Sequence, residues 1–308
     1  MTRVKLVVNV FPGVQNLPHY AALEHGFFAA RGLDIELRYT QSSEEQRKDL
    51  SAGHCDIAHA ALDNAVAMID VAGEDISIVV GLDPSFNKFV VQEEIKTYGD
   101  LRGKTLGVDA PDTAFALIAY EILARNGLPP GSYHVQPIGA TRFRLNALQE
   151  RRIDAAMLNL PFNLMARDTG LRLLDDPLSI IGPYQSVGGF VRRGWAEQNK
   201  AVLADYLASY IEGVRWVLDP AHHAQATQLL SREMKLDAAM AAECVAALTR
   251  PQGGIALDAR LDEAGMKNML NLRARFMQQQ NAAPISRYYD PQYYESALDK
   301  LARADRLR

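Results

Sequence analysis

The sequence predicts an α/β fold of two lobes, each a mixed, mostly parallel sheet flanked by helices, with a helical C-terminal region. Short apolar stretches alternate with longer amphipathic stretches in two consecutive series, which is the pattern of parallel sheets covered by helices. After residue 195 only helical periodicity remains. The 308 residues are 48% apolar, so the chain is long and apolar enough to form two cores without disulfide or metal support.

The first series covers residues 4–82. Residues 4–10 alternate toward a buried strand, and Gly32 ends the first helix because glycine readily adopts the left-handed conformation of a helix cap. Ser42 and Ser43 offer N-cap hydroxyls before Glu44 and Glu45, which predicts a helix start. We expect strands at 4–10, 33–39, 55–60 and 76–82, and helices at 18–30, 42–52 and 64–72.

The second series begins with an extended segment at 88–92 and a short helical turn at 98–103. We expect strands at 105–109, 133–138, 153–158 and 171–174, and helices at 113–126, 142–150 and 162–169. No low-complexity linker separates the two series. The lobes are therefore expected to be joined by strand crossings, near Phe89-Val90 and Gly188-Gly189-Phe190.

The C-terminal region is expected to be helical and docked. Its predicted helices are 195–218, 221–235, 237–248, 261–280 and 291–304. Tyrosine pairs at 288–289 and 293–294 are typical of a segment that packs onto a core. We place lobe 1 at about residues 1–88 and 190–308 and lobe 2 at about 89–189, with a ligand cleft between them.

Composition excludes several classes of protein. The 33 basic and 37 acidic residues give a net charge of −4, which provides no basic footprint for nucleic acid. No stretch reaches the length of about 18 apolar residues that a membrane span needs. Cys55 and Cys244 are outside any CxxC motif; they are either two free buried thiols or a disulfide. Catalytic and phosphate-binding motifs are absent, and we expect no metal and no cofactor.

Four segments carry a resemblance to a known family. They are residues 16–28 with 32–37 (NLPHYAALEHGFF and GLDIEL), 50–58 (LSAGHCDIA), 101–108 (LRGKTLGV) and 147–156 (ALQERRIDAA). With these segments in this order, the sequence resembles the two-lobed solute-binding proteins of bacterial ABC importers. The resemblance is to the type II, periplasmic-binding-protein-like branch for sulfonates, taurine, nitrate and thiamine precursors.

The resemblance implies a receptor that captures a small organic molecule, a sulfonate, carboxylate or heteroaromatic compound, by hinge closure between its lobes. Its partners would be an ABC permease and ATPase, and the receptor itself would be a monomer without a membrane span. No apolar signal region follows Met1. The protein is expected to be periplasmic or lipid-anchored outside the cytoplasmic membrane if a signal was removed, and cytoplasmic if the chain is native as given.

Candidate ligand-binding residues follow the predicted strands, because ligands of open α/β sheets bind at the carboxyl ends of strands. They are Phe11, Asn16, His19, Asp63, Asn64, Asp83, Asp109, Asp112, Thr113, Arg142, Asn159 and Tyr184. In the resembled family the turn at Asp112-Thr113 often offers hydroxyl and N–H groups to an anion. Here Asp112 adds an acid, which would favour a ligand with an amine or N–H edge, unless the two residues only cap a helix.

Arg142 and His19 each have two interpretations. Arg142 could pair with a ligand carboxylate or be an exposed residue of a first helical turn, and His19 could donate to ligand or begin a helix. Asp112 and Arg142 together in the cleft would suit a zwitterionic or heteroaromatic ligand.

Two other functions remain open. The first is an enzyme on the same fold, decarboxylase- or hydrolase-like, acting on a small aromatic or carboxylic acid with His19 and the strand-end acids. A fungal thiamine-pyrimidine synthase of this fold carries a cysteine-rich run that this chain lacks. The second is a cytosolic ligand sensor like the effector domain of LysR-type regulators, although no helix-turn-helix has room before Val4.

Overall fold

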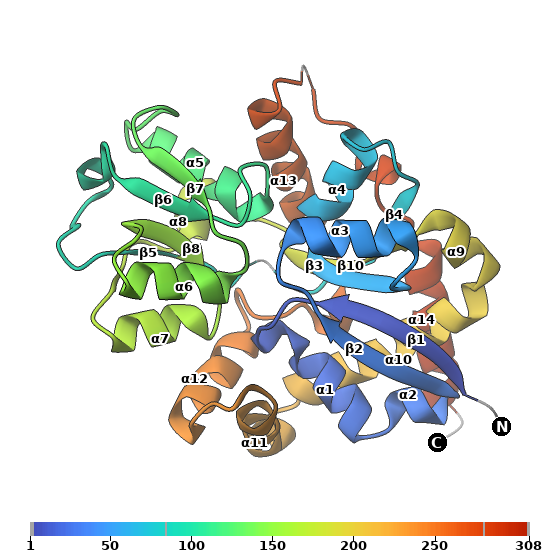
Figure 1. Cartoon of the computed structure of the whole chain (residues 1–308). Coiled ribbons are helices and arrows are strands. Elements are labelled where there is room, and N and C mark those ends of the chain that lie inside the picture. Colours follow the sequence, from blue (N-terminus) through green and yellow to red (C-terminus); the bar gives the residue numbers. More distant parts are fainter. Residues whose placement is uncertain (1–2, 84, 280, 307–308) are drawn as a thin grey trace.

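The computed structural model describes residues 3–83, 85–279 and 281–306, and its strands form two five-stranded sheets (Figure 1). The first has the order β2-β1-β3-β10-β4 and the second the order β7-β6-β8-β5-β9. Helices flank both sheets, so the predicted α/β fold of two mixed sheets is confirmed. We call each sheet with the helices that cover it a lobe.

In the first sheet, β1 pairs in parallel with β2 and β3, whereas β10 is antiparallel to β3 and β4. The strands are β1 (Val4–Val10), β2 (Leu33–Tyr39), β3 (Ile57–Ala61), β4 (Ile76–Val80) and β10 (Val187–Arg192). The helices are α1 (Leu17–Glu24), α2 (Phe27–Ala30), α3 (Ser43–Ala52) and α4 (Asp63–Asp70). The single helix expected over 18–30 is two helices, because Gly26 interrupts it with a left-handed φ of 70°.

In the second sheet, β6 is parallel to β7 and β8, whereas β5 is antiparallel to β8 and β9. The strands are β5 (Lys88–Val91), β6 (Thr105–Val108), β7 (His134–Pro137), β8 (Ala155–Leu158) and β9 (Arg172–Leu173). The helices are η2 (Tyr98–Leu101), α5 (Ala114–Arg125), α6 (Thr141–Gln149), α7 (Phe162–Asp168) and α8 (Pro177–Ile181). Helix α8 is not among the predicted elements; Asp176 caps it by accepting from the Leu178 N–H at 3.1 Å.

The C-terminal region is helical. Its elements are α9 (Arg193–Gln198), α10 (Lys200–Leu218), α11 (His223–Met234), α12 (Ala238–Leu248), α13 (Glu263–Phe276) and α14 (Gln292–Asp305). The helix expected over 261–280 ends at Phe276, and Gln280 lies outside the described residues. Helix α10 lies against α1 so closely that a Cβ on Gly213 would be 2.2 Å from the Pro18 carbonyl oxygen. Tyr288, Tyr293 and Tyr294 are buried, as expected for a docked segment.

The chain crosses between the sheets twice, over residues 81–87 and 174–186; residue 84 lies outside the described part. Both crossings come earlier than predicted, because Phe89-Val90 and Gly188–Phe190 lie inside the strands β5 and β10. The crossings are bonded to each other: the Ser186 N–H donates to the Asp83 carbonyl oxygen at 2.9 Å.

The structure bears on the predictions about the two cysteines and about membrane-spanning segments. Cys55 and Cys244 are free and buried in different hydrophobic cores, which confirms the two-thiol alternative. Among the described residues, no helix is long and apolar enough to cross a membrane.

Candidate functional site

A cavity lies where the two lobes face each other. It holds about 690 Å³ of space free of protein atoms, part of it open to solvent. Its apolar lining comes from Phe11, Val14, Ala60, Ala61, Phe86, Ala114, Phe115, Ala140, Leu160 and Val187. Its polar lining comes from Gln15, Ser43, Asn64, Asp83, Asn87, Asp109, Thr113, Thr141, Arg144, Asn159 and Ser186. A cavity that combines apolar walls with placed polar groups is the usual form of a small-molecule site.

Half of the candidate residues line this cavity. They are Phe11, Asn64, Asp83, Asp109, Thr113 and Asn159. Each follows the carboxyl end of a strand: β1, β3, β4, β6 or β8. The two sheets therefore turn the polar ends of their strands toward a common space, and these six residues remain candidates for ligand contact.

The other six candidates lie outside the cavity lining, and contact between them and a ligand stays a prediction. The Asn16 side chain turns back and donates to the Phe11 carbonyl oxygen at 2.7 Å. Asp63 is buried and pairs with Arg273 at 2.8 Å. Tyr184 is buried in a hydrophobic core, at 1% exposure.

Asp112 and Arg142 occupy the rim between the lobes rather than the cavity. An Asp112 carboxylate oxygen lies 3.5 Å from an Arg47 nitrogen, and Arg142 donates to the Gln41 side-chain oxygen at 3.2 Å. The predicted zwitterion-binding pair is therefore not formed. On α6 it is Thr141 and Arg144, three residues apart and on one face of the helix, that line the cavity.

His19 belongs to a buried cluster rather than to the cavity. Its Nε2 lies 2.9 Å from the Tyr206 hydroxyl, which lies 2.9 Å from His59 Nε2 on its other side. The two imidazole rings are 4.6 Å apart. Burial lowers the pKa of His19 well below its usual value and the pKa of His59 to about 3. Both imidazoles are neutral, and one hydroxyl joins them.

The cluster makes a prediction about acid stability. As the pH falls below 6.5, the free energy of unfolding should decrease less steeply for the His59→Asn variant than for the wild type. The two slopes should differ by about 1.4 kcal/mol per pH unit. Unfolded His59 takes up a proton near pH 6.5, whereas folded His59 resists protonation down to about pH 3, so acid favours the unfolded wild type. Urea unfolding between pH 4.5 and 7 measures the two slopes.

A matched control is His134→Asn, since His134 is exposed on β7. This variant should keep the wild-type pH dependence. Asp83, whose own titration acts in the opposite direction over this range, is present in every protein compared and cancels. Equal slopes for His59→Asn and the wild type would contradict the neutral, buried state of His59.

Charged groups of the cavity are held by defined partners. Asp83 is 3% exposed; its Oδ1 accepts from the Ser85 N–H at 2.8 Å, and burial raises its pKa to about 7. Arg144 is also 3% exposed and donates to the carbonyl oxygens of Met157 and Gly139. Burial lowers its pKa to about 10, which leaves the guanidinium charged at neutral pH.

Several contacts join the lobes along the cavity rim. Asp109 of the second lobe accepts from both the N–H and the hydroxyl of Ser43 in the first. The Ala140 N–H donates to the Gln41 carbonyl oxygen at 3.1 Å. On another side, Arg167 of α7 forms a two-bond ion pair with Glu243 of α12. The two lobes are thus in direct contact on two sides of the molecule.

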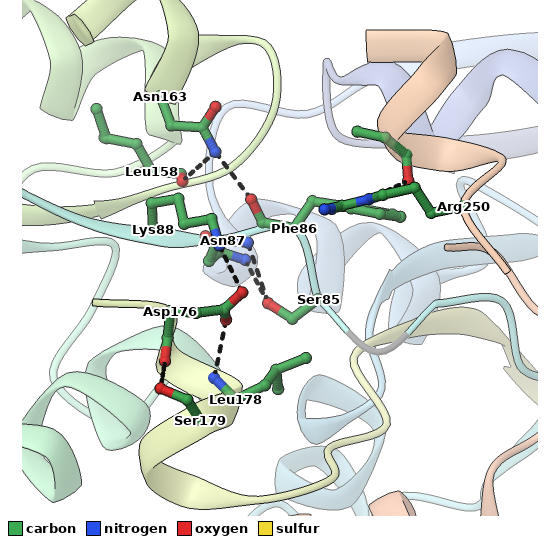
Figure 2. A network of polar contacts seen from close by, with 11 residues as sticks. Ser85, Phe86, Asn87, Lys88, Leu158, Asn163, Asp176, Leu178, Ser179 and Arg250 are labelled. Atoms are coloured by element: carbon green, nitrogen blue, oxygen red, sulfur yellow. Dashed lines mark hydrogen bonds and ion pairs between the residues drawn. The ribbon is translucent and has the colours of Figure 1, made fainter. Parts of the chain in front are cut away.

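The first crossing is fixed to the second lobe. Figure 2 shows the Asn163 amide donating to the carbonyl oxygens of Phe86, at 2.9 Å, and Leu158, at 3.3 Å. In the same view, Ser85 accepts from the Asn87 side chain, and Lys88 pairs with Asp176 at 2.7 Å. Because Asp83, Phe86 and Asn87 also line the cavity, this crossing is one of its walls.

Six polar residues of the cavity lining are not among the twelve candidates: Gln15, Ser43, Asn87, Thr141, Arg144 and Ser186. The sequence around Ser43 indicated only a helix start, although Ser43 also follows the carboxyl end of β2. Arg144 lies inside α6, three residues after a strand-end threonine, and that spacing was the available signal. Among the described residues, no group of three or more His, Cys, Asp or Glu side chains is placed to hold a metal ion.

Comparisons with known proteins give a family from a sequence model and a fold from solved structures. The family model described as "NMT1/THI5 like" matches residues 14–223. A curated relative, the riboflavin-binding protein RibY of Chloroflexus aurantiacus, is 24% identical over 183 residues, 56% of this chain and 51% of that protein. The chain therefore spans about half the length of this relative.

Solved structures show the same fold at low sequence identity. The nitrate-binding protein NrtA of Synechocystis superposes with a TM-score of 0.82 at 14% identity, covering 97% of this chain and 89% of that one. The ligand-binding component of an ABC-type import system from Staphylococcus aureus superposes with a TM-score of 0.79 at 14% identity, covering 96% and 99%.

Proposed function

The chain belongs to the NMT1/THI5-like family, and from this premise we propose that it is a solute-binding receptor of an ABC-type importer. One observation carries the proposal: a cavity with walls from both lobes and from the crossing that joins them. Such a cavity can form only when the lobes approach each other. Binding of a solute would therefore favour the closed arrangement over an open one.

The cavity lining favours binding over the enzymatic alternative. Among the described residues its lining contains no histidine or cysteine, and the Ser43 hydroxyl donates to the Asp109 carboxylate with no imidazole to activate it. His19 and His59 are held in their own cluster. A compound bound here would meet groups that hold and orient it rather than a nucleophile activated by a base.

The remaining parts of the proposal extend from the receptor role. Lobe 1 would comprise residues 1–80 and 187–308 and lobe 2 residues 88–173, close to the expected 1–88 with 190–308 and 89–189, and the two crossings would form the hinge. The receptor would act as a monomer outside the cytoplasmic membrane and deliver its solute to a permease and ATPase. Support comes from the roles of two structural neighbours, a periplasmic nitrate-binding protein and a ligand-binding component of an ABC-type import system.

A thermal-shift screen with mass spectrometry tests this function. The compounds are sulfonates, nitrate, aromatic carboxylates, amino acids, amidines, pyrimidines, riboflavin and thiamine precursors. A ligand at 100 times its Kd should add about 2.7 kcal/mol to the free energy of unfolding and be recovered intact. Asn159→Trp, which fills the cavity, should abolish the shift, whereas Asn271→Trp on the exposed face of α13 should preserve it. Conversion of a compound would overturn the receptor role.

A further inference from the structure

The cavity lining contains buried side-chain oxygens without a hydrogen-bond partner among the described residues. They are Asp83 Oδ2, Asp109 Oδ1, Asn64 Oδ1, Asn87 Oδ1, Asn159 Oδ1 and Ser186 Oγ. Five of the six belong to carboxyl or amide groups and accept hydrogen bonds, whereas the Ser186 hydroxyl can accept or donate. Buried polar atoms are nearly always paired, since an unpaired one costs about 1–3 kcal/mol. The lining therefore calls for an occupant that donates hydrogen bonds.

The donors of the lining, by contrast, are largely used within the protein. Each side-chain nitrogen of Arg144 donates to a protein oxygen. The Thr113 hydroxyl donates to the Ala110 carbonyl oxygen at 2.8 Å, and the Ser43 hydroxyl donates to Asp109. The Asn64 and Asn87 amides donate to the hydroxyl oxygens of Ser43 and Ser85. The Ser186 and Thr141 hydroxyls and the Asn159 amide donate to no described residue, so an anion entering this cavity would find few free donors beside the unpaired carboxylate oxygens.

Asp83 and Asp109 determine whether the cavity prefers a cation or an anion. A carboxylate has no amide nitrogen to exchange for its oxygen, so the unpaired atoms of Asp83 and Asp109 are acceptors in either orientation. With Arg144, they are the charged side chains of the lining, and their formal charges sum to −1 when both acids are ionised. One positive charge on the occupant would neutralise the cavity. Phe11, Phe86 and Phe115 add flat apolar surface beside these groups.

We propose that the cavity takes a small ring compound with a cationic, N–H-rich head group, an amidinium or ring-borne ammonium, and rejects sulfonates and nitrate. The N–H groups of the head donate to the unpaired carboxylate oxygens of Asp83 and Asp109, and the ring lies among the phenylalanines. This proposal rests on the receptor function above. Burial raises the pKa of Asp83 to about 7, so this carboxyl gains most from a nearby positive charge.

Calorimetric titration with matched compounds tests the ligand class. The probes are benzamidine, benzamide, benzoate and benzenesulfonate, with the pyridine and pyrimidine analogues of each. These sets share a ring and differ in the charge and donor content of the head group. We expect the cationic member of at least one set to bind at least ten-fold more tightly than its neutral and anionic partners.

Substitutions of the two cavity aspartates test whether they contact the cation. Asp83→Asn and Asp109→Asn should each weaken binding of the cation at least ten-fold, since a charge-assisted hydrogen bond is lost. Asp299→Asn, an exposed acid on α14, should retain wild-type affinity. The proposal is overturned if no cation binds, if an anion binds more tightly than its matched cation, or if both cavity variants keep full affinity.

The same titrations separate this proposal from the receptor function. Tight binding of an anion that Asn159→Trp abolishes would overturn the ligand class and leave the receptor role supported. Failure of every compound, here and in the wider thermal-shift screen, would overturn both.

Discussion

Replacing Asp83 with asparagine should raise the free energy of unfolding of the ligand-free protein by about 4 kcal/mol at pH 8. Burial raises the pKa of Asp83 from 3.8 to about 7, a difference of about 3 units at about 1.4 kcal/mol each. Ionising this carboxyl therefore costs the folded protein stability above pH 7. Asparagine keeps an oxygen for the Ser85 N–H without requiring a buried charge.

The stability gain of the Asp83→Asn variant should increase with pH. Below pH 3.8 the carboxyl is protonated in both the folded and unfolded states, and the ionisation cost is absent. Between pH 3.8 and 7 only the unfolded state loses its proton, so the stability of the wild type falls relative to the variant. Urea unfolding should show a gain of roughly 1.6 kcal/mol at pH 5 and the full gain at pH 8. Asp34→Asn, an exposed acid on β2, serves as control; a gain that does not depend on pH would contradict the assignment.

Replacing Arg273 with methionine should lower the free energy of unfolding by about 3–5 kcal/mol, because it leaves a buried carboxylate without its partner. The side chains of Arg273 and Asp63 are each 2% exposed, and they form an ion pair at 2.8 Å. The guanidinium also donates to the Asp112 carbonyl oxygen at 3.1 Å. This arginine on α13 therefore contacts α4 of the first lobe and the α5 entry loop of the second.

A double variant separates the lost charge pair from lost packing. Asp63→Asn with Arg273→Met removes both charges and should recover more than 1 kcal/mol of the single-variant loss. Lys267→Met, at an exposed position of the same helix, should change stability by less than about 0.5 kcal/mol. Additive effects of the two substitutions at 63 and 273, measured by urea unfolding, would show that the pair is not coupled.

The fold could be predicted from the sequence because its signals are local. Alternating strands and helices, the Ser42 cap and the glycines at helix ends all act within a few residues of chain. The boundary errors have the same origin. Phe89-Val90 and Gly188–Phe190 were predicted as crossings, but their apolar residues pair inside sheets, and the sequence does not show which strand continues into which sheet.

The site could be predicted only in part, because a strand-end position does not show which other residue the side chain pairs with. Being at the end of a strand was enough to bring Asp83, Asp109 and Asn159 to the cavity. It was not enough for Asp63, whose side chain pairs with an arginine 210 residues later in the chain. His19 similarly bonds to Tyr206, from a helix beyond both sheets. Long-range partners decide which polar strand-end residues remain available to a solute.

The first crossing has a consequence for how selectivity could change. Residues of this segment line the cavity, and the same segment must bend if the lobes separate. A substitution there would alter two quantities together: the intrinsic affinity of the closed form and the fraction of molecules that close. An affinity measured in solution is the product of the two. Substitutions in this segment that change which solute binds would therefore also change how easily the lobes open and close. Substitutions at Asn159 or Thr113, which lie outside the crossing, would change the cavity contacts and leave the hinge largely unaltered.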